Sequence, residues 1–172
     1  MNLQSTDFEI FGLPPLFAVD REALDRRWKD LQREAHPDRF AAADAAAQRQ
    51  AMQWSVRINE AYQRLKDPLK RAAYLCELNG APVQAENNTA MPAAFLMQQM
   101  EWREQLDDAS ESADLERMAD EVAAERRRMQ QGLKVTADDE QDFPALAGQV
   151  RALMFVERFA RDVENRLEQL GQ

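Results

Sequence analysis

The chain has 172 residues, of which 45% are hydrophobic and 31% charged, a length that can bury one core or two small ones. Its formal net charge at pH 7 is -9, but residues 1–78 carry 12 basic and 12 acidic side chains, whereas residues 79–172 carry 10 and 19. An acidic second half repels phosphate backbones, so no nucleic acid is expected as a partner, and a cationic partner would meet this half.

The N-terminal residues 1–15 contain two acidic side chains and no lysine or arginine, unlike the basic start of a secretory signal. No apolar run approaches the ~20 residues that cross a bilayer, so no membrane partner is expected. Cys76 is the single cysteine, which excludes an internal disulfide and a cysteine-rich zinc site. We therefore expect a cytoplasmic protein that holds no metal and no cofactor.

A helix is predicted over residues 21–35, because Asp20 is a good N-cap and apolar residues recur at helical spacing. The stripe that faces the core comprises Leu24, Trp28, Leu31 and Ala35. Three basic residues lie on the opposite stripe, namely Arg26, Lys29 and Arg33. Pro37 ends this helix, because the residue before a proline is driven out of the helical region. The helix thus has a core face and a basic face.

Two more helices are predicted in the first half, over about residues 41–66 and 68–79. Four residues that could be mistaken for functional ones lie on or near apolar stripes and are expected in the core, namely Trp28, Trp54, Tyr62 and Cys76. The tripeptide His36-Pro37-Asp38 therefore occupies the loop of an antiparallel helical hairpin.

A linker is predicted after this hairpin, because residues 79–89 (NGAPVQAENNT) are rich in Gly, Pro and Asn. We expect one domain over residues 1–78, a linker over 79–91 and a second domain over 92–172. Helical periodicity in the second domain predicts three helices, over about 92–108, 112–133 and 143–170. Val and Ile are few and no alternating pattern persists, so the fold is predicted to be all-α, with a three-helix antiparallel bundle after the hairpin.

His36 is the only histidine of the chain. As a general base it would need a nucleophile, and no serine or cysteine is evidently placed for it; one histidine with scattered carboxylates is also a poor metal site. For an arbitrary tripeptide of this kind, a purely structural role is the commoner explanation: Pro37 stops one helix and Asp38 caps the next. A hydrolase that uses His36 as its base is the alternative from the enzyme class.

The surroundings of the tripeptide resemble a J-domain. The stretch FGLP lies ahead of the basic helix, and INEAYQRLKDPLKRAAYL follows the loop. J-domain proteins deliver clients to DnaK-type chaperones and stimulate their ATP hydrolysis through this loop. The resemblance implies that role for His36, Pro37 and Asp38, and for the basic residues Arg26, Lys29, Arg33 and Arg39. Arg39 stands where many J-domains have lysine, and it keeps the charge.

Beyond the linker, AFLMQQMEWREQLDDA and VRALMFVERF resemble the C-terminal domain of the HscB family, J-type co-chaperones of iron-sulfur cluster assembly. The Gly/Phe-rich stretch and zinc cysteines of DnaJ-type proteins are missing, as is the cysteine-rich extension of animal HscB members, so the chain resembles a bacterial form. The resemblance implies an adaptor, not an enzyme, that presents the scaffold protein IscU to the chaperone HscA. The alternative is a general J-protein that serves unfolded clients.

The predicted helix over residues 92–108 has a mixed apolar and acidic face that points outward. Phe95, Trp102 and Leu106 share its inner side. The outer side carries Leu96, Met97, Met100, Glu101, Glu104 and Asp108. Exposed apolar groups with an acidic rim indicate a partner site, unless these side chains complete the bundle or cover the J-domain.

Phe155 and Phe159 fall off the apolar seam of the last helix and lack an evident core role. The family resemblance implies scaffold binding at the positions of Leu96, Met97, Met100, Glu101, Glu104 and Phe155. Asp108 joins this set from the helical pattern, and the role of Phe159 stays open.

Overall fold

The computed structural model describes residues 1–84 and 91–171, and these residues form helices and connecting turns without a strand. The elements are α1 (Asp7–Phe11), α2 (Arg21–Ala35), the 3-10 helix η1 (Pro37–Phe40), α3 (Ala45–Lys66), α4 (Pro68–Leu78), α5 (Ala93–Asp108), α6 (Ser112–Lys134), the π-helix η2 (Val135–Asp139) and α7 (Phe143–Leu170). The all-α prediction is confirmed.

The chain divides into two compact units, Met1–Leu75 and Cys76–Gln172. The division falls inside α4, a few residues before the linker expected over 79–91. Residues 85–90 of that expected linker lie outside the described residues.

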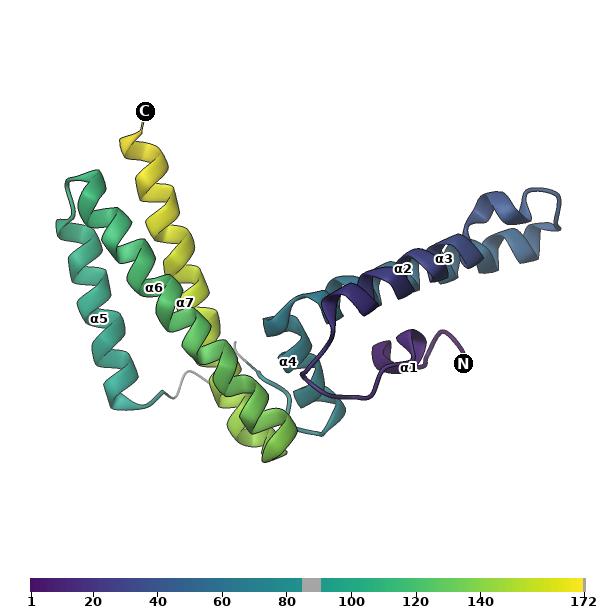
Figure 1. Ribbon diagram of the computed structural model, residues 1–172, viewed down its shortest axis with the longest axis horizontal. Coiled ribbons are helices and arrows are strands. Elements are labelled where there is room, and N and C mark those ends of the chain that lie inside the picture. Colours follow the sequence, from purple (N-terminus) through teal and green to yellow (C-terminus); the bar gives the residue numbers. More distant parts are fainter. Residues whose placement is uncertain (85–90, 172) are drawn as a thin grey trace. The chain divides into compact units, whose positions relative to one another are not determined.

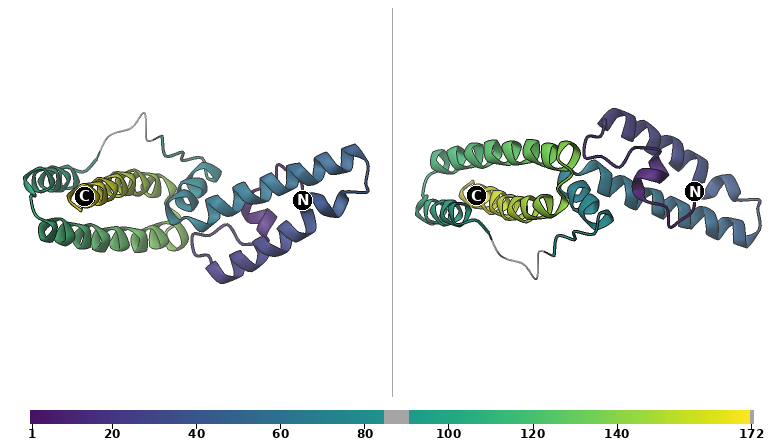
Figure 2. Two further views of the ribbon diagram at one scale, coloured as in Figure 1. Left: turned by 90° about the horizontal axis from the view of Figure 1, so that it is seen from above. Right: turned by 90° about the horizontal axis from the view of Figure 1, so that it is seen from below.

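In the first unit, α2 and α3 run antiparallel and form the predicted hairpin (Figures 1 and 2). Asp20 caps α2, since its side chain accepts hydrogen bonds from the backbone N–H groups of Glu22 and Ala23. The core between these helices and α1 consists mainly of Phe8, Ile10, Phe11, Leu24, Leu31, Ile58, Ala61 and Leu65, all buried. Burial of this apolar face supplies most of what holds the hairpin together.

The second helix of the hairpin begins at Ala45, so the predicted start near residue 41 is wrong. Asp44 is the N-cap, and its carboxylate accepts a hydrogen bond of 2.8 Å from the N–H of Ala47. The alanine-rich stretch around residue 41 is helix-favouring, and this concealed the capping residue Asp44, three positions further on. The chain from Pro37 to Phe40 forms a 3-10 turn.

Two of the four residues expected in the core are less buried than predicted. Tyr62 and Cys76 are buried, but Trp28 and Trp54 are only half-buried. Trp28 stacks on Tyr62 with ring centroids 4.6 Å apart. A large indole at the edge of a helical layer is often highly buried without being fully enclosed.

In the second unit, α5, α6 and α7 lie side by side, and α6 runs opposite to the other two (Figures 1 and 2). Helical spacing predicts an apolar seam along α7 that comprises Leu146, Val150, Leu153, Val156, Ala160, Val163, Leu167 and Leu170. It is confirmed over Leu146, Val150, Leu153, Val156 and Val163, which are all fully buried. It does not continue to the end of the helix, where Leu170 is 43% exposed. On α6 the matching buried residues are Leu115, Met118, Val122 and Leu133.

Candidate partner-binding sites

The loop between α2 and α3 presents the His36-Pro37-Asp38 tripeptide to solvent. The side chains of His36 and Asp38 are 54% and 93% exposed. The backbone N–H of Asp38 donates to Nδ1 of His36 at 3.2 Å, so the imidazole itself caps the 3-10 turn. In a neutral ring this leaves the proton on Nε2, which remains able to donate to another molecule. The idea that Asp38 caps the next helix is wrong, because Asp44 does so.

The basic face of α2 lies on the same hairpin as the loop. Arg26, Lys29 and Arg33 are all exposed, as their helical positions predict. Arg33 makes only a loose contact of 3.6 Å with the exposed Asp30. Pairs of this kind contribute little to stability, so the cationic face is available to a partner.

Besides Asp30, the carboxylate of Asp25 borders this basic face. The Tyr62 hydroxyl donates to Asp25 at 2.6 Å and Arg21 donates to it at 2.9 Å, and these two bonds lower the pKa of the Asp25 carboxyl. Asp25 therefore stays ionised at neutral pH and neutralises Arg21. The net positive charge of the face comes from Arg26, Lys29 and Arg33.

The tripeptide lies on an exposed loop, and the described residues place few polar groups around its imidazole. In the described chain the polar contacts of the imidazole are to Asp38 alone. No cluster of three or more His, Cys, Asp or Glu side chains that could hold a metal ion occurs among residues 1–84 and 91–171. Within those ranges, no helix is long and apolar enough to cross a membrane.

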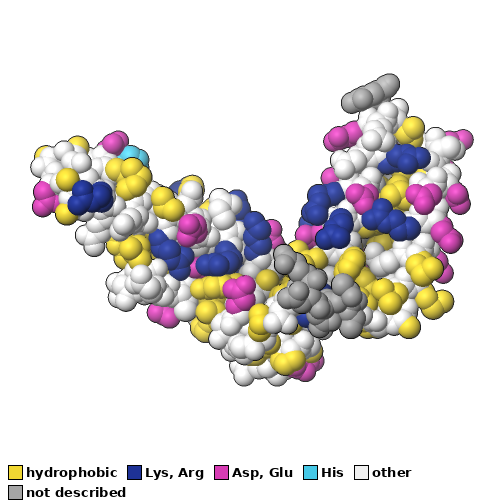
Figure 3. All heavy atoms as spheres, turned by 180° about the vertical axis from the view of Figure 1, so that it is seen from behind, with side chains coloured by type: hydrophobic (Ala, Val, Ile, Leu, Met, Phe, Trp, Pro, Cys, Tyr) yellow, Lys and Arg dark blue, Asp and Glu magenta, His cyan; other side chains and the backbone are white. Residues whose placement is uncertain are grey.

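The second exposed surface lies on α5 and α7 in the other unit. Three apolar residues of α5 are exposed as predicted, with Leu96 at 47%, Met97 at 63% and Met100 at 64%. Phe155 of α7 is 38% exposed, and its ring meets that of Phe95 edge to face with centroids 6.5 Å apart. In this unit hydrophobic side chains lie beside acidic and basic ones on the face shown in Figure 3.

The acidic residues predicted for this surface are also exposed: Glu101, Glu104 and Asp108. They lie on the outward side of α5, and the described residues offer them no ion pair. We call Leu96, Met97, Met100, Glu101, Glu104, Asp108 and Phe155 the α5–α7 surface. Unpaired carboxylates around exposed apolar groups suit a partner that is both apolar and basic.

The inner side of α5 is only partly as predicted. Trp102 and Leu106 are buried, whereas Phe95 is half-buried and lies against Phe155 at the edge of the surface. Phe159, whose role was open, is 1% exposed and stacks on Trp102 with centroids 5.3 Å apart. It was missed as a core residue because it faces α5, whereas the seam found in the sequence faces α6 and the bundle centre.

Comparison with known proteins covers both units of the chain. Residues 91–164 match the family model described as the HSCB C-terminal oligomerisation domain. The chain is 50% identical to the co-chaperone protein HscB homolog of Ralstonia nicotianae, with 96% of each chain covered. It is 49% identical to that of Burkholderia thailandensis, over 99% of this chain and 98% of the relative.

Comparison with solved structures leads to the same group of proteins. Chaperone HscB from Vibrio cholerae is 36% identical, with a TM-score of 0.82 over 96% of this chain and 99% of the other. Human co-chaperone HscB, at 23% identity, shares the fold with a TM-score of 0.89 over 96% of this chain and 84% of the other. A helical hairpin with an exposed His-Pro-Asp loop, followed by a helical bundle, is the architecture of a J-type co-chaperone. The chain belongs to the HscB family of co-chaperones.

Proposed function

We propose that this chain binds the iron-sulfur scaffold protein IscU on its α5–α7 surface and delivers it to HscA, a DnaK-type chaperone. The loop residues His36, Pro37 and Asp38 stimulate the HscA ATPase. The protein acts in the cytoplasm as an adaptor without chemical turnover of its own. IscU and HscA are the partners that membership in the HscB family implies.

The observation that carries the proposal is the presence of two different exposed surfaces on one chain. The first unit exposes a cationic helix face together with the His-Pro-Asp loop, which suits an acidic ATPase surface. The second unit exposes apolar side chains framed by Glu101, Glu104 and Asp108. An adaptor needs two such surfaces of different chemistry, because its two partners must be bound at once.

Arg39 also belongs to the proposed ATPase-contacting set. It is exposed, and its guanidinium reaches only a weak 3.5 Å contact with the carbonyl of Glu34. A long cationic side chain next to the tripeptide can therefore turn toward a partner at little cost. It would extend the positive charge of Arg26, Lys29 and Arg33 as far as the loop.

The proposal is tested by two measurements on the whole chain. Calorimetry with folded IscU should show saturable binding, and the ATPase rate of HscA should rise when the chain is added and rise further with IscU present. A set of unrelated unfolded polypeptides serves as the control for the general J-protein alternative. Tight binding to these polypeptides together with no binding to IscU would contradict the proposal and favour that alternative.

A further inference from the structure

Arg158 lies at the edge of the α5–α7 surface and was not among the residues expected to bind the scaffold. It is exposed, and its guanidinium carbon lies 5.7 Å from the centroid of the Phe155 ring. A guanidinium held against an aromatic ring is attracted by the ring face and keeps its N–H groups available at its rim. A guanidinium group therefore lies beside the exposed aromatic ring of this surface.

The position of Arg158 on α7 places it toward α5. Residues three and four apart on a helix share a face, and Arg158 lies three after Phe155 and four before Asp162. Both neighbours contact α5: Phe155 meets Phe95, and Asp162 accepts a hydrogen bond of 2.7 Å from Arg103. Arg158 therefore stands in the row of side chains that line the junction of the two helices.

The nearby acids are already engaged by other arginines. Asp162 pairs with Arg103, and Glu157 pairs with Arg126 at 3.2 Å. Arg158 has no carboxylate within ion-pair distance in the described part of the chain. Its charge beside an exposed apolar cluster is thus uncompensated, which is costly once a partner covers the cluster unless that partner brings an acceptor.

Among the described residues, the charges around the apolar cluster that have no ion-pair partner are therefore acidic on α5 and basic on α7. Glu101, Glu104 and Asp108 lie on α5, and Arg158 lies on α7. A partner that fits both must present basic groups to α5 and an acidic group to α7. Such a bipolar arrangement fixes the orientation in which the partner binds, because the reversed orientation would bring like charges together.

The geometry points to Arg158 as a specificity-determining residue of the α5–α7 surface. Its guanidinium binds a carboxylate side chain of the scaffold, next to the apolar group of the scaffold that packs on Phe155. This inference rests on the proposed function, since the scaffold is its occupant. Planar N–H donors oriented by the ring match the two oxygens of a carboxylate, and exclusion of water by the surrounding apolar groups strengthens that contact.

The test compares three substitutions in the whole chain, Arg158→Lys, Arg158→Gln and Arg158→Glu, by calorimetry with IscU at low and physiological salt. Loss of a charge pair at an interface predicts about a tenfold weaker affinity for the Gln variant and a larger loss for the Glu variant. The Lys variant should fall between the Gln variant and the unchanged chain, because it keeps the charge and loses the planar fork. The affinity of the Gln variant should also depend less on salt.

The matched control is Arg127→Glu, an identical charge change at another exposed arginine, on α6. It should alter affinity by no more than about twofold, as expected for a charge away from the interface. Equal losses from Arg127→Glu and Arg158→Glu would overturn the inference, because they would reflect net charge alone. So would unchanged binding by Arg158→Gln.

Leu96→Ala separates this inference from the proposed function. Weakened binding by Leu96→Ala together with normal binding by all Arg158 variants would leave the scaffold site in place and remove Arg158 from it. Failure of the unchanged chain to bind IscU would refute the proposed function and the inference with it. Melting curves of each variant identify any loss that comes from misfolding, and Arg158→Gln, the mildest change, decides the result if Arg158→Glu is unstable.

Discussion

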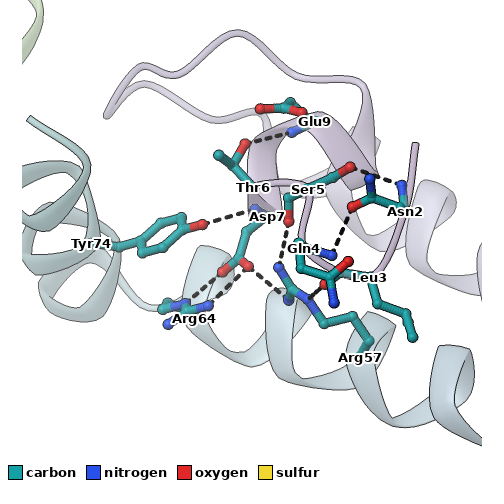
Figure 4. A network of polar contacts seen from close by, with 10 residues as sticks. All are labelled: Asn2, Leu3, Gln4, Ser5, Thr6, Asp7, Glu9, Arg57, Arg64 and Tyr74. Atoms are coloured by element: carbon teal, nitrogen blue, oxygen red, sulfur yellow. Dashed lines mark hydrogen bonds and ion pairs between the residues drawn. The ribbon is translucent and has the colours of Figure 1, made fainter.

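The carboxylate of Asp7 is held by the guanidinium of Arg64 through two hydrogen bonds, of 2.5 Å to Oδ2 and 2.9 Å to Oδ1 (Figure 4). Asp7 is fully buried, and Arg57 adds a second ion pair at 2.8 Å. The N–H of Asp7 donates to the Tyr74 hydroxyl at 3.0 Å, and Arg57 also donates to the carbonyl of Ser5. The N-terminal segment is thereby tied to α3 and α4, which support the hairpin that carries the loop.

Replacement of Asp7 by asparagine should destabilise the first unit strongly. The change keeps the shape but leaves two arginine charges facing a buried amide, a situation that typically costs about 3–5 kcal/mol. Urea unfolding followed by circular dichroism measures the loss. Asp30→Asn is the control, because the Asp30–Arg33 pair is exposed and should contribute about 0–1 kcal/mol. Similar losses from both variants would contradict this account.

His36→Gln should abolish stimulation of the HscA ATPase while leaving the fold and IscU binding intact. Glutamine keeps polarity but lacks the ring whose Nδ1 caps the 3-10 turn, so the loop loses its geometry. The loop is exposed and buries none of its side chains, so the melting temperature should change little. Full stimulation by a folded His36→Gln protein would count decisively against the role proposed for the loop.

Reversal of two charges on the basic face, Arg26→Glu with Lys29→Glu, should slow association with HscA. These side chains are exposed and unpaired in the described structure, so they act mainly by long-range attraction. For the unchanged chain, binding should weaken as salt rises and the Debye length shortens to ~8 Å near physiological ionic strength. Stopped-flow association rates at several salt concentrations provide the measurement. Salt-independent rates would point to an apolar interface.

Cys76 should react slowly with thiol reagents in the native protein. Burial raises the pKa of its thiol from the ordinary value of 9.0 to about 11, against a smaller opposing effect of Arg151. The thiolate is the reactive form, so at pH 8 both its scarcity and its burial suppress reaction, and the rate should rise as the pH approaches 11. Labelling with a chromogenic disulfide, with and without urea, tests this. Rapid native labelling at pH 8 would show that Cys76 is accessible.

The same pKa difference makes a contribution to stability that depends on pH. In the folded state the thiol keeps its proton up to about pH 11, whereas in the unfolded chain it loses it near the ordinary value of 9.0. The unfolded state therefore binds fewer protons between these two values, and the stabilising contribution is lost as the pH rises through that window. Below pH 9 it is fully present.

The parts of the fold that the sequence predicted are those where a local signal and burial agree. Asp20 caps α2 as expected, and Asp67 and Pro68 start α4, with Asp67 accepting from the N–H of Leu69 at 2.9 Å. The start of α3 was missed because an alanine-rich stretch favours helix on both sides of Asp44. The five residues of α1 are too few to show a periodic pattern, and tertiary contacts of Asp7 hold them.

The site residues that the sequence predicts are those whose exposure follows from the pattern of a single helix. Exposure of Leu96, Met97 and Met100 follows from helical spacing once the buried side of α5 is known. The burial of Phe159 does not follow from helical spacing, because α7 packs against both α5 and α6. The seam found in the sequence describes only one of these two contacts. Spacing alone treats Phe155 and Phe159 alike, and only the position of Trp102 separates them.

Phe155 and Phe159 lie one turn apart on α7 and differ sharply in burial. Phe155 is 38% exposed, whereas Phe159 is 1% exposed and is covered by Trp102 and by the guanidinium of Arg103, 5.1 Å from its ring. Phe159→Ala should open a cavity and destabilise the bundle by about 3–5 kcal/mol. Phe155→Ala should leave the melting temperature nearly unchanged.

For scaffold binding the order should be reversed, with Phe155→Ala weakening the affinity for IscU and Phe159→Ala leaving it nearly normal. The single substitutions Phe155→Ala, Leu96→Ala and Met97→Ala should each weaken the affinity for IscU by about 1–2 kcal/mol. The variant with all three substitutions should lose more. Calorimetry well below the melting temperature of Phe159→Ala should show near-normal affinity for the fraction that is folded. A collapsed melt of the triple variant would identify these three residues as core. Normal IscU binding by a stable triple variant would remove the α5–α7 surface as the scaffold site.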